Sequence, residues 1–162
     1  MDSRVTVRKG EVSDLDTLCN LYSEFYAFNA ELQPHFYVSV RESGAYPCEE
    51  LNNDSAAIFI AYIDNIGVGF IHIREESTPP YPSVANHQFG SIVDVFVREN
   101  YRNRGVGGLM ISYAKEWATG RGLRYLELMV LHNNYEAIRF YEKIFFKPSS
   151  TTMKHFLDDD FQ

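Results

Sequence analysis

The spacing of apolar side chains predicts a short strand and then a long helix in the first third of the chain. Val5 and Val7 alternate with polar neighbours, which is the period of a strand. From Leu15 onward, apolar residues recur three or four positions apart, which is the period of a helix with one buried face. Pro34 ends or bends that helix, because proline interrupts the backbone hydrogen bonds. Residues 33–53 have no clear period and fit a short helix with a loop.

The remaining apolar runs predict further strands and helices. In chain order, the strands are expected at 56–63, 68–73, 89–97, 126–131 and 151–157, and the helices at 106–121 and 134–145. The residues between the first two of these strands, 64–67, have hairpin-turn chemistry. This order is typical of an α/β domain built around a mixed sheet. No repeat or linker divides residues 1–162, so we expect a single domain.

Composition and charge exclude several classes of protein. The formal net charge is −7, whereas a general nucleic-acid binder presents a basic surface, so we expect no nucleic-acid partner. No apolar run approaches 18 residues and the stretch MDSRVTVRKG has no apolar signal region, so we expect no membrane partner and a cytoplasmic protein. Cys19, Cys48 and the five histidines lack the spacing of metal ligands, so we expect no metal.

The stretch RNRGVGGLM, residues 102–110, combines glycines and arginines at a predicted strand-to-helix corner. A helix start presents unpaired N–H groups and the positive end of the helix dipole, so such a corner attracts phosphate. Spacing decides among the phosphate-binding families. No lysine follows Gly107 or Gly108, which excludes the Walker A pattern. Met110 stands where a dinucleotide-binding loop has its third glycine, which makes that pattern a poor fit.

Two motifs together resemble the GCN5-related N-acetyltransferase (GNAT) superfamily. Arg102, Gly105 and Gly107 fill the pattern R/Q-x-x-G-x-G/A of that family's acetyl-CoA pyrophosphate loop. Residues 134–146, NYEAIRFYEKIFF, are similar to the family's second motif, N-x-x-A-x-x-x-Y-E-K-x-G-F. They depart from it with Phe145 where glycine is usual, which puts the geometry of that turn in question.

The resemblance covers roughly residues 3–157 and implies a fold and a cofactor. The fold is a mixed, mostly antiparallel sheet of six to seven strands flanked by about four helices, with strands 89–97 and 126–131 splayed apart. Acetyl-CoA would enter that opening and pair with the strand backbone, and its pyrophosphate would lie on the glycine-rich corner. The residues that the resemblance assigns to acetyl-CoA are Val95, Phe96, Val97, Arg102, Asn103, Arg104, Gly105, Val106, Gly107, Gly108, Asn134 and Tyr141.

Acetyl transfer to an amine needs a base, because an alkyl ammonium with a pKa of ~10.4 is only about 0.1% free base at neutral pH. Asp94 is the one charged residue in the apolar run 91–97, and strand alternation places it on the face of Ile92 and Phe96. We expect Asp94 to be the base; the alternatives are a water chain and a purely structural carboxylate. The resemblance places Tyr141 where the family has a general acid for the departing CoA thiolate, and the alternative is a core aromatic side chain.

The acceptor is less well defined by the sequence. Neither cysteine lies in a nucleophile setting, which favours direct attack by the amine in a ternary complex. In the family, the first helices line the acceptor site. We therefore expect Glu24 and Glu31 to bind the amine, and Tyr26 and Phe28 to enclose it. The alternative is that the aromatic side chains of this helix belong to the core and that the two glutamates lie on its solvent-exposed face. A small-molecule amine is the leading substrate, followed by a peptide N-terminus or protein lysine, and by a non-catalytic acetyl-CoA-binding module. Dimers are common in the family, so a homodimer is one assembly that the sequence allows.

Overall fold

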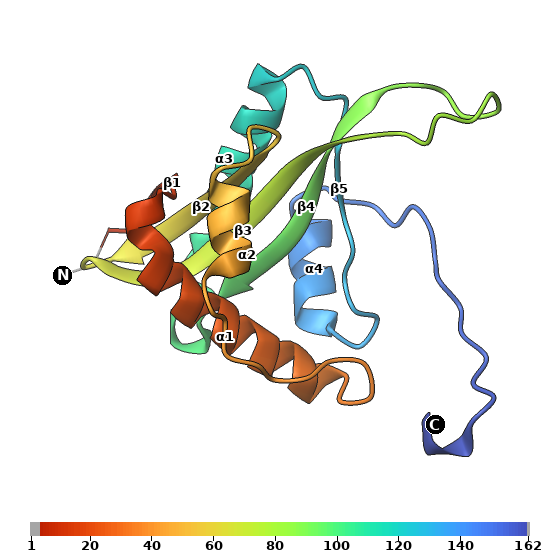
Figure 1. Cartoon of the computed structure of the whole chain (residues 1–162), viewed down its shortest axis with the longest axis horizontal. Coiled ribbons are helices and arrows are strands. Elements are labelled where there is room, and N and C mark those ends of the chain that lie inside the picture. Colours follow the sequence, from red (N-terminus) through yellow and green to blue (C-terminus); the bar gives the residue numbers. More distant parts are fainter. Residues whose placement is uncertain (1–3, 162) are drawn as a thin grey trace.

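The computed structural model describes residues 4–161, which form one mixed sheet of five strands with four α-helices around it (Figure 1). The strands, in spatial as in chain order, are β1 (Thr6–Lys9), β2 (Ala56–Ile63), β3 (Ile66–Ser77), β4 (Gln88–Val97) and β5 (Leu126–Leu128). The α-helices are α1 (Leu15–Leu32), α2 (Ala45–Leu51), α3 (Val106–Gly120) and α4 (Tyr135–Lys143), and short 3-10 turns lie at Val12–Asp14, Glu99–Tyr101 and Asp159–Phe161. The pairs from β1 to β4 are antiparallel and β5 is parallel to β4, which confirms the predicted mixed α/β sheet.

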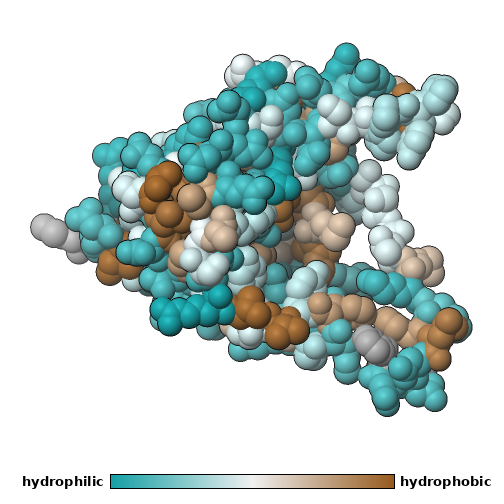
Figure 2. Space-filling model, viewed as in Figure 1, coloured by the Kyte–Doolittle hydropathy of each residue, from teal (hydrophilic) through white to brown (hydrophobic). Residues whose placement is uncertain are grey.

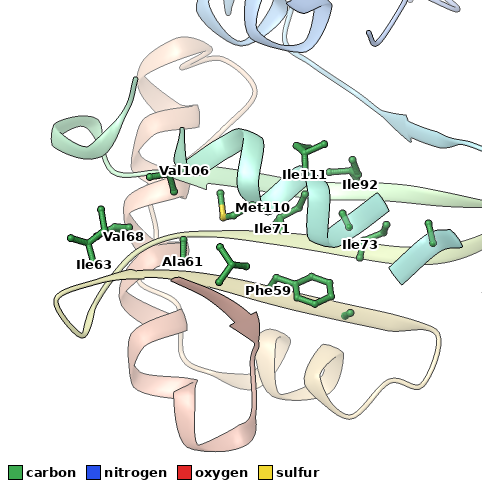
Figure 3. Close-up of a cluster of buried hydrophobic side chains, with 14 residues drawn as sticks. Phe59, Ala61, Ile63, Val68, Ile71, Ile73, Ile92, Val106, Met110 and Ile111 are labelled. Atoms are coloured by element: carbon green, nitrogen blue, oxygen red, sulfur yellow. The ribbon is translucent and has the colours of Figure 1, made fainter. Parts of the chain in front are cut away.

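The central strands β2 and β3 are apolar on both sides, so helices cover both faces of the sheet. The cluster under α1 and α2 consists of Leu18, Leu21, Tyr22, Ile58, Ile60, Phe70 and Phe96. The cluster under α3, drawn in Figure 3, includes Phe59, Ala61, Ile71, Ile73, Ile92, Met110 and Ile111. Each fully buried side chain of this size contributes roughly 1.5–3 kcal/mol, so the two clusters hold the sheet firmly between its helical layers.

Strand β4 pairs with β5 over only its first half. The parallel pairing runs from Gly90 and Leu126 to Ile92 and Leu128, whereas β4 continues to Val97. The two strands therefore separate, as predicted. Within residues 4–161, no other strand pairs with that edge of β4. This half of the edge is open to an added strand.

The prediction of six to seven strands is wrong for the described chain, which forms five. The expected strand at 151–157 does not form, because this segment has no neighbouring strand with which to pair; Met153 and Leu157 are 89% and 92% exposed. In Figures 1 and 2 the segment after α4 stands apart from the sheet. The expected strand at 126–131 is shortened to β5, since β4 offers it no partner beyond Ile92.

The turn after β2 and the turn after α4 use left-handed backbone conformations at residues other than glycine. Asp64 (φ 50°) and Asn65 (φ 63°) form the tight hairpin turn between β2 and β3, as predicted. Phe145, just beyond α4, has φ 73° and is 88% exposed. It occupies the position where the resemblance expects glycine. A phenylalanine therefore makes this left-handed turn at a cost of roughly 1–2 kcal/mol.

Candidate active site

A β-bulge at Val93 decides the direction of Asp94. In the β3–β4 ladder the register shifts by one residue between Ile92 and Asp94, so Val93 is an extra residue on β4 and Asp94 stands opposite His72. The extra residue reverses the alternation of side chains. Ile92 lies in the cluster under α3, whereas Phe96 lies in the cluster under α1 and α2. Asp94 shares the face of Phe96, and the prediction that it also shares the face of Ile92 is wrong, because alternation assumed an unbroken strand.

Asp94 lies at the edge of a buried polar cluster beneath α1 and α2. Its Oδ2 is 3.6 Å from Nδ1 of His72, a residue with no exposed surface. The hydroxyls of Tyr22 and Tyr46 each lie 3.4 Å from the same nitrogen. On the other side of the ring, His72 Nε2 is 2.7 Å from Glu50. The Asp94 side chain keeps 17% of its surface exposed, so it connects the cluster to the outside.

Arg74 closes this cluster at Glu50. Its Nε and Nη2 donate to the two carboxylate oxygens of Glu50 at 2.7 and 2.6 Å. Burial alone would raise the pKa of Glu50, but the hydrogen bonds from Arg74 and the neighbouring His72 outweigh burial and lower it. Burial raises the pKa of Tyr46 to about 12 and that of Tyr22 further still. Both phenols therefore keep their protons at neutral pH and can donate hydrogen bonds.

Three residues of this cluster were not predicted as site residues from the sequence: His72, Glu50 and Arg74. One signal was present: a histidine within the apolar run VGFIHI, since a polar side chain in a buried strand needs a buried partner. Glu50 carried no such signal. It lies near the end of a helix of 7 residues, too short for its pattern to separate a buried carboxylate from a solvated one.

The start of α3 carries backbone N–H groups without an intrahelical partner. The first bond of the helix runs from the Leu109 N–H to the Gly105 carbonyl at 3.0 Å, so the N–H groups of Val106, Gly107 and Gly108 have no acceptor within the helix. No side chain of the described residues caps them. The stretch RNRGVGGLM thus forms the kind of helix start that attracts an anion.

The three glycines of this stretch meet different constraints. Gly105 has φ 77°, a conformation that a side chain makes costly. A Cβ on Gly107 would lie 3.1 Å from Cζ of Phe140, so this glycine allows α3 and α4 to approach closely. A Cβ on Gly108 would meet nothing within 4 Å. Gly107 therefore has a packing role besides the predicted contact with pyrophosphate, and the open space lies at Gly108.

The two arginines of the loop are placed differently. The Arg102 Nε donates to the Val97 carbonyl at 3.0 Å, and its guanidinium lies 4.7 Å from the centre of the Phe28 ring. Its Nη1 is 3.8 Å from a Glu136 oxygen. Arg102 thus ties the loop to the end of β4, to α1 and to α4. Arg104 is exposed on the loop and is the better placed of the two to reach an external anion.

Asn134 and Tyr141 lie at the two ends of α4. The Asn134 Oδ1 accepts a hydrogen bond from the Ala137 N–H at 3.2 Å and so caps the helix. The Tyr141 ring meets Phe146 edge-on, with ring centres 5.7 Å apart. Burial raises the pKa of Tyr141 to about 12, so its phenol stays protonated at neutral pH. Tyr141 packs against the cluster under α3, whereas Asp94 faces α1 and α2. The two predicted catalytic side chains thus belong to opposite faces of the sheet.

The residues predicted to bind the acceptor are Glu24, Tyr26, Phe28 and Glu31, and all four lie on α1. Glu24 forms an ion pair with Arg98 at 2.6 Å, and the Tyr26 hydroxyl donates to Glu42 at 3.0 Å. Phe28 lies under the Arg102 guanidinium, and Glu31 is exposed. Three of these side chains therefore have partners within the protein, and their role toward a substrate stays a prediction.

Residues 4–161 contain neither a metal-binding group of side chains nor a membrane-spanning helix. No three side chains of His, Cys, Asp or Glu in this part of the chain converge as a metal site would require. Within the same residues, no helix has both the length and the apolar composition needed to cross a bilayer.

Known acetyltransferases are similar to this chain. An uncharacterised N-acetyltransferase of Archaeoglobus fulgidus is 30% identical over 135 residues, which are 83% of this chain and 88% of the relative. The L-ornithine N5-acetyltransferase NATA1 of Arabidopsis thaliana is 38% identical over 66 residues, 41% of this chain and 29% of that protein. Among solved structures, the aminoglycoside N-acetyltransferase AAC(6')-Iy in complex with CoA superposes with a TM-score of 0.76 at 19% identity, over 96% of this chain and 95% of that one.

The family model of the acetyltransferase (GNAT) family matches residues 15–145. This span contains Asp94, the loop at the start of α3, and Tyr141. Acetyl-CoA is the acetyl donor in this family. The match confirms the resemblance drawn from the two motifs, and the chain therefore belongs to the acetyltransferase (GNAT) family.

Proposed function

We propose that this acetyltransferase moves an acetyl group from acetyl-CoA to a primary amine of a small molecule, by direct attack in a ternary complex. The features that follow one another along strand β4 are the main support for this proposal. Its pairing with β5 ends at Ile92, Asp94 follows the bulge, and the strand then leads into the uncapped start of α3. One segment of chain thus combines an open strand edge, a partly exposed carboxylate and an anion site.

The residues around the start of α3 fit the pyrophosphate of acetyl-CoA. The N–H groups of Val106, Gly107 and Gly108 need acceptors, the space beside Gly108 is open, and Arg104 adds a positive charge. The open edge of β4 at residues 95–97 fits the amides of pantetheine, which can pair with it like an added strand. When bound, acetyl-CoA supplies the activated acetyl group.

Asp94 is the base in this proposal and Tyr141 is the donor to the departing sulfur. Asp94 is partly exposed, so an ammonium group can reach it and lose a proton to it. Tyr141, with a pKa raised to about 12 by burial, holds its proton. Since a phenol is a weaker acid than a thiol, Tyr141 stabilises the leaving thiolate mainly by a hydrogen bond rather than by full proton transfer.

Several observations support a small cationic amine as the acceptor. The chain carries a net charge of −7, which favours the approach of a cation. Tyr26 and Tyr46 are half-buried near Asp94, and their rings can stack on an ammonium group. Two similar proteins act, by their names, on ornithine and on aminoglycosides.

An acceptor panel analysed by mass spectrometry tests this proposal. The panel contains acetyl-CoA with ornithine, a polyamine, an aminoglycoside, a peptide with a free N-terminus and a lysine peptide with a blocked one. We expect a mass increase of one acetyl group on at least one small amine. Acetylation of the peptides alone would contradict the proposal of a small-molecule substrate but would still support acetyl transfer. Binding of acetyl-CoA without any acetylated product would indicate a non-catalytic module.

A further inference from the structure

We infer that His72 and Asp94 act together as one proton acceptor, with Glu50 holding the far side of the imidazole ring. The inference rests on the proposed role of Asp94 as the base. His72 has no exposed surface and cannot touch an acceptor amine, so it acts through Asp94 and is a positioning residue. Its contribution is to receive a share of the proton that Asp94 takes from the amine.

The hydrogen bonds of the cluster fix the orientation of the imidazole. Glu50 accepts two hydrogen bonds from Arg74, which keeps its carboxylate ionised. An ionised carboxylate is only an acceptor, so the 2.7 Å contact places a proton on His72 Nε2. The other ring nitrogen, Nδ1, is then directed toward Asp94 at 3.6 Å. This nitrogen is where the ring can gain a second proton.

The charges of the cluster favour that second proton. Glu50 and Asp94 carry two negative charges against the single positive charge of Arg74, all close to a buried ring. A proton on His72 Nδ1 balances these charges and places the imidazolium between two carboxylates. The same charge in isolation would be costly to bury. The two carboxylates compensate that cost in this geometry.

In this inference the proton moves from the substrate ammonium to Asp94 and is then shared with His72. The N–H bond of the substrate ammonium breaks, the proton goes to an Asp94 oxygen, and it is shared with His72 Nδ1. The electron pair stays on the amine nitrogen, which becomes the nucleophile. After transfer, the proton returns through Asp94, the exposed end of the His72–Asp94 pair, to water. No oxidant or reductant takes part.

Every other titratable group against the ring is compatible with this role. Tyr22 comes from α1 and Tyr46 from α2, and both phenols keep their protons because burial raises their pKa values. Either hydroxyl can donate to the single lone pair of Nδ1 when this nitrogen is unprotonated. The bulge at Val93 completes the arrangement, since without it Val93 would stand opposite His72 in place of Asp94.

Kinetics of His72→Gln test the inference, with Glu75→Gln as the matched control. Glu75 lies on the same strand β3 but pairs with Arg121 at 2.7 Å, outside the cluster. For His72→Gln we expect kcat/KM for the amine to fall about 10- to 100-fold at neutral pH, with an unchanged KM for acetyl-CoA. We also expect the acid limb of its pH profile to move to lower pH, because a lone carboxylate now accepts the proton. Glu75→Gln should match the wild type, and a purely structural role of His72 would lower the rate equally at every pH.

NMR of the histidine rings gives a readout that does not depend on turnover. In protein labelled at its histidines, the ring nitrogen signals of His72 should show a proton on Nε2, and Asp94→Asn should change the signal of Nδ1, the nitrogen that faces Asp94. An unchanged Nδ1 signal in Asp94→Asn would overturn the inference, and this measurement does not require His72→Gln to fold. Amine-dependent turnover with an unshifted acid limb in His72→Gln would overturn it too and leave the proposed function intact. A wild-type protein that acetylates no amine would overturn both, whatever the NMR signals show.

Discussion

Gly107 at the start of α3 lies against the ring of Phe140 on α4. A Cβ on Gly107 would lie 3.1 Å from Cζ of Phe140, whereas a Cβ on the next residue, Gly108, would meet nothing within 4 Å. This contact joins the uncapped start of α3 to the helix that carries Tyr141. This glycine–ring contact, together with the Arg102–Glu136 pair, joins the proposed pyrophosphate site to the helix of the proposed acid.

Replacing Gly108 with alanine should raise the stability of the protein and weaken its binding of acetyl-CoA. Gly108→Ala adds a methyl group in open space and should stabilise the helix by up to about 1 kcal/mol, since alanine is the better helix former. The same methyl group enters the space where the pyrophosphate would approach, so acetyl-CoA binding should weaken by about tenfold, or ~1.4 kcal/mol. Thermal unfolding and calorimetric titration measure the two effects.

Gly107→Ala is the control for this pair of effects. Its methyl group must displace the ring of Phe140, so the gain in helix propensity should be offset and the melting temperature should not rise. Equal or tighter acetyl-CoA binding by Gly108→Ala would show that the open space is not used by the cofactor.

Tyr141→Phe should lower kcat about 100-fold while the KM for acetyl-CoA stays within about twofold of wild type. The phenol of Tyr141 has a pKa raised to about 12 by burial, so it holds its proton throughout the neutral and mildly alkaline range. The wild-type rate should therefore show no loss from Tyr141 ionisation between about pH 7 and 10. Tyr135→Phe, on the same helix but 60% exposed, should have no effect. Equal turnover of Tyr141→Phe and wild type would remove Tyr141 from the mechanism.

Phe145→Gly should stabilise the protein. The left-handed backbone at φ 73° costs phenylalanine roughly 1–2 kcal/mol, and glycine adopts it freely. Phe145→Ala separates backbone strain from the loss of an exposed apolar ring, because alanine removes the ring but keeps the Cβ. Denaturant unfolding should rank Phe145→Gly about 1 kcal/mol above Phe145→Ala. If the two variants are equally stable, strain at this turn is not the cause.

The sequence predicted those features of the fold that are determined by patterns over a few neighbouring residues. The hairpin from β2 to β3 and the helix α3 follow from spacing and turn chemistry over a few residues. The departure at Phe145 was also visible, because the second motif expects glycine there. Asp94 was identified because it is the one charged residue in its apolar run.

Features that depend on tertiary pairing could not be predicted in the same way. The bulge at Val93 is a property of two paired strands, and it reversed the expected relation of Asp94 to Ile92. The His72–Glu50 contact joins residues 22 positions apart through the packing of α2 on the sheet. The segment 151–157 was predicted as a strand, but it pairs with no other strand within residues 4–161.

Acid should remove the contribution of Asp14 to stability. Its pKa is lowered to about 2, chiefly by the hydrogen bond from Arg8, so the carboxylate stabilises the fold above its ordinary pKa and loses this effect as pH falls toward 2. Asp14→Asn should cost about 1–2 kcal/mol at pH 7, a figure reduced because Arg8 is half exposed.

Urea unfolding at pH 7 and near pH 2 measures this effect, and Asp16→Asn, an exposed acid in the first turn of α1, is the control. The difference between Asp14→Asn and wild type should fall to a small fraction of its value at pH 7, because about half of the Asp14 carboxylates are protonated near their pKa of about 2. A difference of the same size at both values would show that Asp14 contributes through its shape and not its charge.

The release of CoA thiol from acetyl-CoA, followed with and without an amine, tests the central claim most directly. We predict that the wild-type protein releases thiol at a rate that depends on the concentration of a small primary amine, and that Asp94→Asn reduces this rate by about 100-fold or more. Tight binding of acetyl-CoA with thiol release that no amine accelerates would contradict the claim.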